Sequence, residues 1–425
     1  MLPFPPPSNS SKRLILLSTL FLLAWPLAAQ ETEPPPVESA EEQEAPQQPS
    51  KKRVKLRLSL ETLYDENLIN LRDDAIDEFE SGDFEADRYK IESVDDVILI
   101  PRIWLEYIVT PQSGRSSRFG AFGSWSRPVE NSISDNQRYG FFVRQDLSDI
   151  RADLAEIELE REALQPRLFK TRRSFLLSNR SDLLLMYYLT DSRYAGQLSD
   201  DDFAVRREAR YDYDTYRIDW RQRLSKGESN RPRLLLGYRY IERDYNHFFD
   251  ERDSTADVYQ LGLDLFHLHQ SFYSQLEWLY EFQDLESNTA LIGTVGPGGT
   301  IQDDLTHERD RFRLRLAFLW FAEREGAVLR RSNRLRFGVT YANKDYTTEN
   351  ALDLTHFRRE DDVYQFSAEY RHAVSDDLTL EIYGRLHDQD TSRPILDELE
   401  ETTFSDFVLG VRLNLYADWW LADDQ

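Results

Sequence analysis

The stretch RFRLRLAFLW, residues 311–320, decides the fold class of this chain. Every second residue of it is apolar: Phe312, Leu314, Leu316, Phe318 and Trp320. Three of the positions between them are arginines: Arg311, Arg313 and Arg315. Successive side chains of a β-strand point to opposite faces, so this segment has one apolar and one charged face. Lipid on one side and water on the other suit this pattern, and the sequence therefore predicts an all-β fold, a transmembrane antiparallel β-barrel.

Similar alternation recurs along the chain and predicts about 14 strands, an even number that leaves the first strand's start and the last strand's end both in the periplasm. The predicted strands are 54–64, 98–110, 118–126, 138–144, 181–190, 208–222, 233–243, 256–266, 272–284, 310–321, 332–346, 362–372, 378–387 and 404–416. Short turns alternate with long, mostly acidic loops, as in bacterial barrels. Residues 148–165 fit a short periplasmic helix; the alternative is an additional strand pair, which would bring the count to about 16.

The N-terminal segment carries the features of an export signal. Lys12 and Arg13 precede an apolar run that ends in Leu27, Ala28 and Ala29. We expect residues 1–29 to be a cleaved signal peptide; the alternative is an N-terminal anchor helix. Residues 30–53 are rich in Pro and Glu and are predicted to be a disordered periplasmic linker before a barrel at 54–420. No later run approaches the roughly 18 apolar residues of a membrane helix.

Composition excludes several classes of protein. The chain has no cysteine, which removes disulfides, thiolate metal sites and cysteine nucleophiles. Its net charge of −25 makes nucleic-acid binding unfavourable, because phosphate repels an acidic surface. The 24 Phe, 22 Tyr and 8 Trp contradict a disordered chain.

The charged faces of the predicted strands would line the lumen, and basic residues outnumber acidic ones there. The candidate selectivity residues are Arg239, Arg311, Arg313, Arg315, Arg334, Arg336, Arg371, Arg385 and Arg412. Arginines around a pore attract anions, which predicts a passive channel for small, anionic solutes. The alternative is that carboxylates on the same faces, such as Glu61, Glu277 and Glu369, pair with these arginines and fill a narrow lumen.

Aromatic residues near strand ends, among them Tyr238, Tyr280 and Tyr416, suit the girdles at the two membrane interfaces. The alternative is the core of a soluble β-sandwich, but no second apolar layer is evident in the sequence. His267 and His269 are the sole close histidine pair and lack a third ligand nearby, so we favour a chance pair over a metal site. We expect no enzymatic activity, no metal and no cofactor, because no nucleophile with a base is apparent.

Two short elements carry a family resemblance: YDEN at residues 64–67 and SVDDVILIP at residues 93–101. They resemble the first hairpin of outer-membrane β-barrel porins of the Gram-negative β-barrel porin 2-like kind, and residues 237–266 look like the later hairpins of that family. Glu66 replaces an Asp of the family pattern, and the chain ends in Gln425 rather than an aromatic residue.

The last predicted strand is similar to the signal that the barrel-assembly machinery binds, through Gly410, Leu413, Leu415 and Tyr416. The resemblance implies location in the cell outer membrane, with lipid, lipopolysaccharide and the assembly machinery as partners. The lumenal arginines predict a small anionic solute as cargo. A closed structural or surface-interaction barrel and an export pore for an anionic polysaccharide remain alternatives. The sequence leaves the oligomeric state open.

Overall fold

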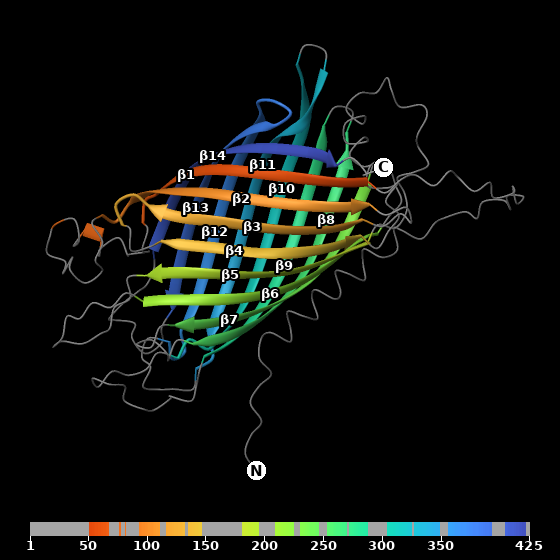
Figure 1. Ribbon diagram of the computed structural model, residues 1–425. Coiled ribbons are helices and arrows are strands. Elements are labelled where there is room, and N and C mark those ends of the chain that lie inside the picture. Colours follow the sequence, from red (N-terminus) through yellow and green to blue (C-terminus); the bar gives the residue numbers. More distant parts are fainter. Residues whose placement is uncertain are drawn as a thin grey trace, which may run out of the picture. The chain divides into compact units, whose positions relative to one another are not determined.

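A computed structural model shows a closed barrel of 14 antiparallel strands (Figure 1). It describes residues 51–67, 76–77, 81, 93–110, 116–131, 135–146, 181–194, 209–224, 230–245, 253–269, 272–287, 304–324, 327–348, 356–392 and 404–421. The strands are β1 (Lys51–Asp65), β2 (Asp96–Thr110), β3 (Ser117–Pro128), β4 (Asn136–Asp146), β5 (Ser181–Tyr194), β6 (Ala209–Arg223), β7 (Asn230–Tyr245), β8 (Ser254–Leu268), β9 (Tyr273–Ser287), β10 (His307–Arg324), β11 (Ala327–Tyr346), β12 (Glu360–Ala373), β13 (Leu378–Ser392) and β14 (Phe404–Leu421).

Each strand pairs with its neighbours in sequence, and β1 pairs with β14 to close the sheet. Every predicted strand is present, and the count of 14 excludes the alternative of 16, because β4 and β5 pair directly from Asn136↔Ser192 to Asp146↔Asp182. The helix predicted at 148–165 lies outside the described residues, as do the predicted signal peptide and most of the linker. Strand β1 begins at Lys51, inside the predicted linker.

The connections differ between the two ends of the barrel. At one end they comprise 111–116, 224–229, 269–272, 325–326 and 374–377, with 147–180 as the long exception. At the other end they comprise 66–95, 129–135, 195–208, 246–253, 288–306, 347–359 and 393–403. We call these the short-turn end and the long-loop end. Strand β1 starts and β14 finishes at the short-turn end, in agreement with the predicted alternation.

The outer face of the sheet exposes large apolar side chains. Leu60 is 54% exposed, Phe141 57% and Leu386 54%, and each neighbours similar residues on adjacent strands. On β10 the apolar row Phe312–Trp320 covers nine residues, about the length that a tilted strand needs to cross a bilayer. Within the described residues, no helix is long and apolar enough to span a membrane.

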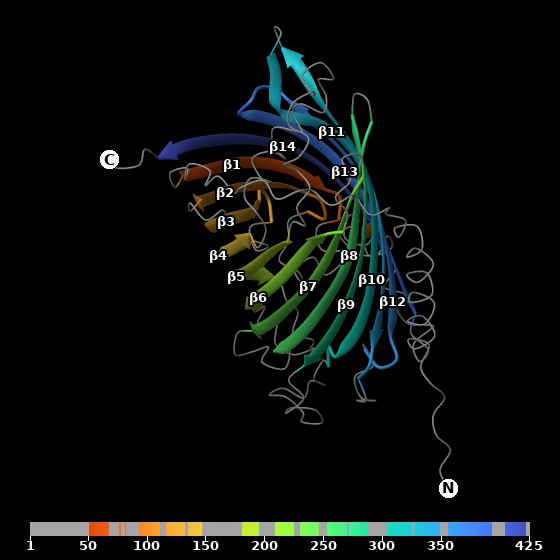
Figure 2. The same ribbon diagram turned by 90° about the vertical axis from the view of Figure 1, so that its right-hand side faces the viewer.

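Two walls of the barrel lie opposite each other. Strands β2–β6 are in front and β9–β13 behind in Figure 1, and the turned view of Figure 2 separates the same two groups of strands. The strand order places β3 and β4 half-way round the barrel from β10 and β11. The candidate site is formed by side chains that face the interior from these two walls and from the strands between them.

Candidate functional site

The charged side chains of the strands lie on the inner face of the barrel. Tyr383 on β13 reaches over β14 to Glu61 on β1, and Arg239 on β7 reaches over β8 to Glu281 on β9. In a closed sheet, side chains converge on the concave side, so contacts that skip a strand mark the interior. The opposite face of each strand carries the exposed apolar residues.

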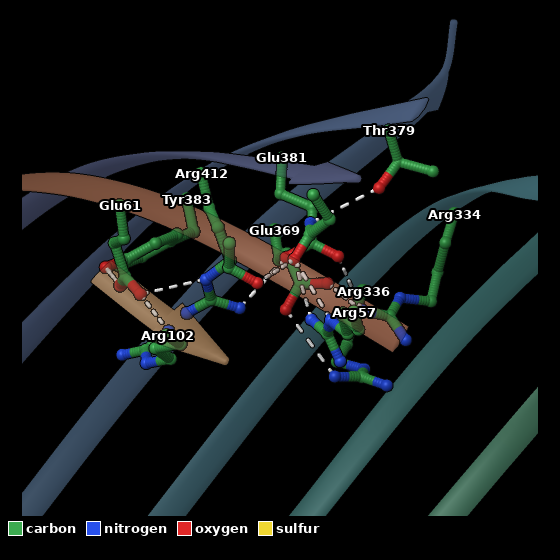
Figure 3. Close-up of polar contacts among 12 residues, drawn as sticks. Arg57, Glu61, Arg102, Arg334, Arg336, Glu369, Thr379, Glu381, Tyr383 and Arg412 are labelled. Carbon is green, nitrogen blue, oxygen red and sulfur yellow. Dashed lines mark hydrogen bonds and ion pairs between the residues drawn. The ribbon is translucent and has the colours of Figure 1, made fainter. Parts of the chain in front are cut away.

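Strands β11–β14, β1 and β2 share one network of ion pairs (Figure 3). Glu61 is 1% exposed and accepts hydrogen bonds from Arg102, from the Tyr383 hydroxyl and from Arg412 Nε at 2.8 Å. Arg412 also donates to Glu381 at 2.9 Å, so it bridges two buried carboxylates. A buried carboxylate is stable only with such partners.

Glu369 joins the same network from β12. It pairs with Arg334 and, at 3.5 Å, with Arg336, both on β11. Arg334 also lies 3.8 Å from Glu381. Three carboxylates therefore bind four arginines here.

A second network lies on β7–β10. Glu281 pairs with Arg239, with Arg309 at 3.2 Å and with Arg311 at 3.8 Å. Glu277 pairs with Arg313 at 2.8 Å and with Arg315 at 3.4 Å. Two carboxylates therefore serve five arginines.

The ion pairs do not neutralise the two networks, and we call the inner surface that these networks form the arginine wall. In the two networks nine arginines share five carboxylates, which leaves an excess of four positive charges. Such an excess in a region partly shielded from water raises the local concentration of anions.

Seven of the nine predicted selectivity residues are thus ion-paired, as the alternative interpretation expected: Arg239, Arg311, Arg313, Arg315, Arg334, Arg336 and Arg412. The other two differ. Arg371 donates to the backbone oxygen of Ser332 at 3.1 Å and to its hydroxyl at 2.6 Å, and Arg385 lies 4.9 Å from the ring centre of Tyr383. Among the described residues, no carboxylate lies within ion-pair distance of either.

The opposite inner wall is aromatic, and the sequence analysis missed it. Trp104 stacks on Phe122 at 5.2 Å between ring centres and lies 4.6 Å from Phe142, while Phe122 lies 6.1 Å from Tyr188. Arg138 lies over Tyr188 at 5.4 Å. We call Trp104, Phe122, Phe142 and Tyr188 the aromatic wall.

A row of tyrosine–aspartate pairs on the outer face was also missed. Five tyrosine hydroxyls donate to aspartates at 2.5 to 2.9 Å: Tyr64 to Asp95, Tyr187 to Asp214, Tyr238 to Asp257, Tyr280 to Asp310 and Tyr341 to Asp362. In each case the aspartate stands two residues before the one directly opposite the tyrosine. A sequence motif would have revealed this row. It is Asp-X-aromatic, which occurs at residues 214–216, 257–259, 310–312 and 362–364.

The girdle prediction is wrong for Tyr416. Its ring lies on the inner side, 5.6 Å from the guanidinium of Arg57 and 3.8 Å from that of Arg331. Tyr238 and Tyr280 lie on the outer face, as predicted, in the row just described.

The predicted assembly residues occupy both faces of β14. Leu413 and Leu415 are 44% and 48% exposed on the outer face. Gly410 faces inward, and a Cβ there would lie 2.2 Å from the Tyr383 ring. Glycine at this position therefore lets Tyr383 cross β14 to reach Glu61.

The histidine pair gives no sign of a metal centre. His267 and His269 have ring centres 4.5 Å apart, and His269 stacks on Phe272 and shares a hydrogen bond with Ser274 at 2.9 Å. No group of three or more potential metal ligands occurs in the part of the chain that the structure describes.

No protein-family model matches the sequence, and no curated protein matches it. The resemblance of residues 64–67 and 93–101 to a porin family therefore stays a prediction. Solved structures with a similar fold include the outer membrane protein OprD from Pseudomonas aeruginosa, at 10% identity and TM-score 0.32 over 87% of this chain and 94% of that one. An anion-selective porin from Comamonas acidovorans gives 10% identity and TM-score 0.32 over 87% of this chain and 100% of that one.

CdiB from Acinetobacter baumannii gives 8% identity and TM-score 0.40 over 86% of this chain, which spans 60% of the CdiB chain. At these identities and TM-scores the likenesses carry no argument about function.

Proposed function

We propose that this chain is an outer-membrane β-barrel that conducts small anionic solutes passively, without catalytic chemistry. Its outer face supports the membrane location. Leu60, Phe141 and Leu386 are more than half exposed, and water would not stabilise a continuous surface of this kind. An apolar band on a closed antiparallel barrel suits lipid, because closure leaves no backbone edge unpaired.

The observation that carries the anion preference is the excess of arginine over carboxylate on the arginine wall. Ion pairing lowers the positive potential there without removing it, because Glu277 and Glu369 each serve two arginines. A solute anion can take the place of the missing carboxylates as it passes. Chloride and small carboxylates would meet this wall more favourably than cations would.

The second candidate is a structural barrel without an open pore, and one observation favours it. Arg313, Arg315, Arg334 and Arg336 all have carboxylate partners, which is what a packed interior needs. In that case the arginine wall would serve stability alone.

Single-channel recording with the refolded barrel in a planar bilayer, under a salt gradient, separates the two candidates. The informative variant is Arg315→Gln with Arg336→Gln, because it leaves Arg313 with Glu277 and Arg334 with Glu369. This variant removes two positive charges and leaves each carboxylate with one arginine partner, so the barrel should still fold. We expect discrete currents from the wild type and a weaker anion preference in the variant.

Two outcomes would count against the proposal. A folded barrel that shifts its mobility on heating yet stays electrically silent would favour the structural candidate. Currents whose ion preference is the same in wild type and variant would remove the arginine wall from the mechanism.

A further inference from the structure

Three arginines near the short-turn end stand apart from the ion-pair networks. Arg57 comes from β1, Arg331 from β11 and Arg371 from β12. Among the described residues, no carboxylate oxygen lies within 4 Å of any of the three, whereas all nine arginines of the two networks have such a partner. Their charge is therefore uncompensated by ion pairs.

Neutral oxygens hold all three of these guanidinium groups in place. Arg57 donates from Nε at 3.2 Å and from Nη2 at 2.7 Å to the side-chain oxygen of Asn414. Asn414 is fully buried and is itself fixed by Ser59 at 2.8 Å and Thr379 at 3.2 Å. An amide oxygen orients a guanidinium group without cancelling its charge.

The third arginine joins the first two through Tyr416 and Ser332. Arg331 lies 3.8 Å from the centre of the Tyr416 ring, on which Arg57 also stacks, and its Nε donates to the backbone oxygen of Asp376 at 3.2 Å. Arg371 is bonded through Nε and Nη2 to Ser332, the residue that follows Arg331. Two guanidinium groups, from β1 and β11, thus face one ring of β14, and the third, from β12, is held beside the residue that follows Arg331.

The neighbouring carboxylates form no ion pair with this cluster. Glu61, Glu369 and Glu381 are already bound by Arg102, Arg334, Arg336 and Arg412. Asp377 and Asp418 attract Arg331 from beyond ion-pair distance, and Asp418 is bound by Arg53. The Nη1 atoms of Arg57 and Arg371 and both Nη atoms of Arg331 have no hydrogen-bond partner among the described residues. These unused donors could bind the oxygens of an anion.

We propose that Arg57, Arg331 and Arg371 form a binding site for a phosphate-class oxyanion at the short-turn end of the barrel. Guanidinium forks match the oxygens of phosphate, and three fixed cations suit a doubly charged anion better than a single carboxylate. The ligand is inorganic phosphate or the phosphate group of a phosphorylated solute. The proposal deepens the proposed function and rests on it for the solute's path, but binding itself does not require conduction.

Equilibrium dialysis of the folded wild-type barrel in detergent, against radiolabelled inorganic phosphate and in parallel against glucose 1-phosphate, tests the site. The variant Arg57→Gln with Arg371→Gln removes two of the three cations. Its matched control, Arg127→Gln with Arg138→Gln, removes two charges from the opposite side of the barrel: the Arg127 side chain on β3 is exposed, and Arg138 on β4 lies over the Tyr188 ring.

We expect saturable binding by the wild type, a loss of affinity of about tenfold or more in the cluster variant, and a change of less than about twofold in the control. Binding of glucose 1-phosphate but not free phosphate would identify the ligand as a phosphorylated solute, and the reverse would identify it as the free ion. If the double variant does not fold, the single variant Arg331→Gln, at the end of the barrel, should still lower the affinity for phosphate, by less than about tenfold.

Wild-type protein without saturable binding would overturn the proposal, as would an equal loss in variant and control. The channel proposal fails separately. Phosphate binding by a barrel that carries no current would support the site and contradict the channel. Current without phosphate binding would support the channel and contradict the site.

Discussion

The arginine wall and the aromatic wall face each other across one barrel and are stabilised in different ways. On the arginine wall, buried groups such as Glu61 depend on partners from three other strands. On the aromatic wall, Trp104, Phe122 and Phe142 pack by shape, and Phe142 is only 4% exposed. The two large ion-pair networks therefore lie outside the aromatic cluster, and a ring of that cluster can be replaced by another uncharged side chain without changing the charge of the lumen.

Phe142→Ala should cause the largest loss of stability. It removes a buried ring that contacts Trp104 and leaves a cavity, which costs about 3–5 kcal/mol. Urea unfolding of the refolded barrel measures the loss, and Phe142→Leu, which fills most of the space, should cost less than about 1.5 kcal/mol. If Phe142→Ala also changed the ion preference, the separation between the two walls would be broken.

Glu61→Gln should cost somewhat less, although it removes a charge with three partners. We expect about 2–3 kcal/mol, below the usual loss for a broken buried pair, because Arg412 keeps Glu381 and Arg102 is 36% exposed. The same unfolding experiment applies, with Glu66→Gln, an exposed carboxyl near the end of β1, as the control. Equal effects of the two substitutions would mean that the Glu61 network contributes no stability.

Gly120→Ala should cause the smallest loss of stability of the three, and it tests how closely β3 packs against the aromatic wall. Its Cβ would lie 2.1 Å from the Phe142 ring and 2.8 Å from the backbone oxygen of Leu105, so the ring and the backbone of β2 must both shift, at a cost of about 1–2 kcal/mol. Gly123→Ala on the same strand is a close control, since its Cβ would meet nothing nearer than 3.5 Å. A cost for Gly123→Ala as large as for Gly120→Ala would show that backbone flexibility, not the ring, accounts for both.

The sequence predicted the strands because their two faces differ so clearly. On β10 the arginines and the apolar residues occupy alternate positions, and the predicted strand 310–321 lies within the observed His307–Arg324. The ends were underestimated, since Arg309 and His307 continue the strand with the same alternation beyond the apolar row. Charged residues at a strand end look like loop in sequence, although the ladder of hydrogen bonds continues through them.

The site was harder to predict, for two physical reasons. On β2 both faces are largely apolar, so Trp104 on the inside cannot be distinguished by alternation from Ile103 and Leu105 on the outside. Partners far apart in sequence are set by closure of the barrel: Tyr383 meets Glu61 only because β14 pairs with β1 in one register and Gly410 leaves room between them. The same closure brings Arg57 to Tyr416, which the sequence placed in the girdle.

The most direct test of the unbalanced arginine wall is the reversal potential of the barrel in a planar bilayer under a salt gradient, compared between wild type and Glu277→Gln with Glu369→Gln. These substitutions remove the carboxylates that Arg313, Arg315, Arg334 and Arg336 share. An unbalanced arginine wall should give the wild type a reversal potential of the sign for anion preference, and the variant should shift the potential further in that direction. A cation-preferring wild type, or a potential that the variant leaves unchanged, would contradict it.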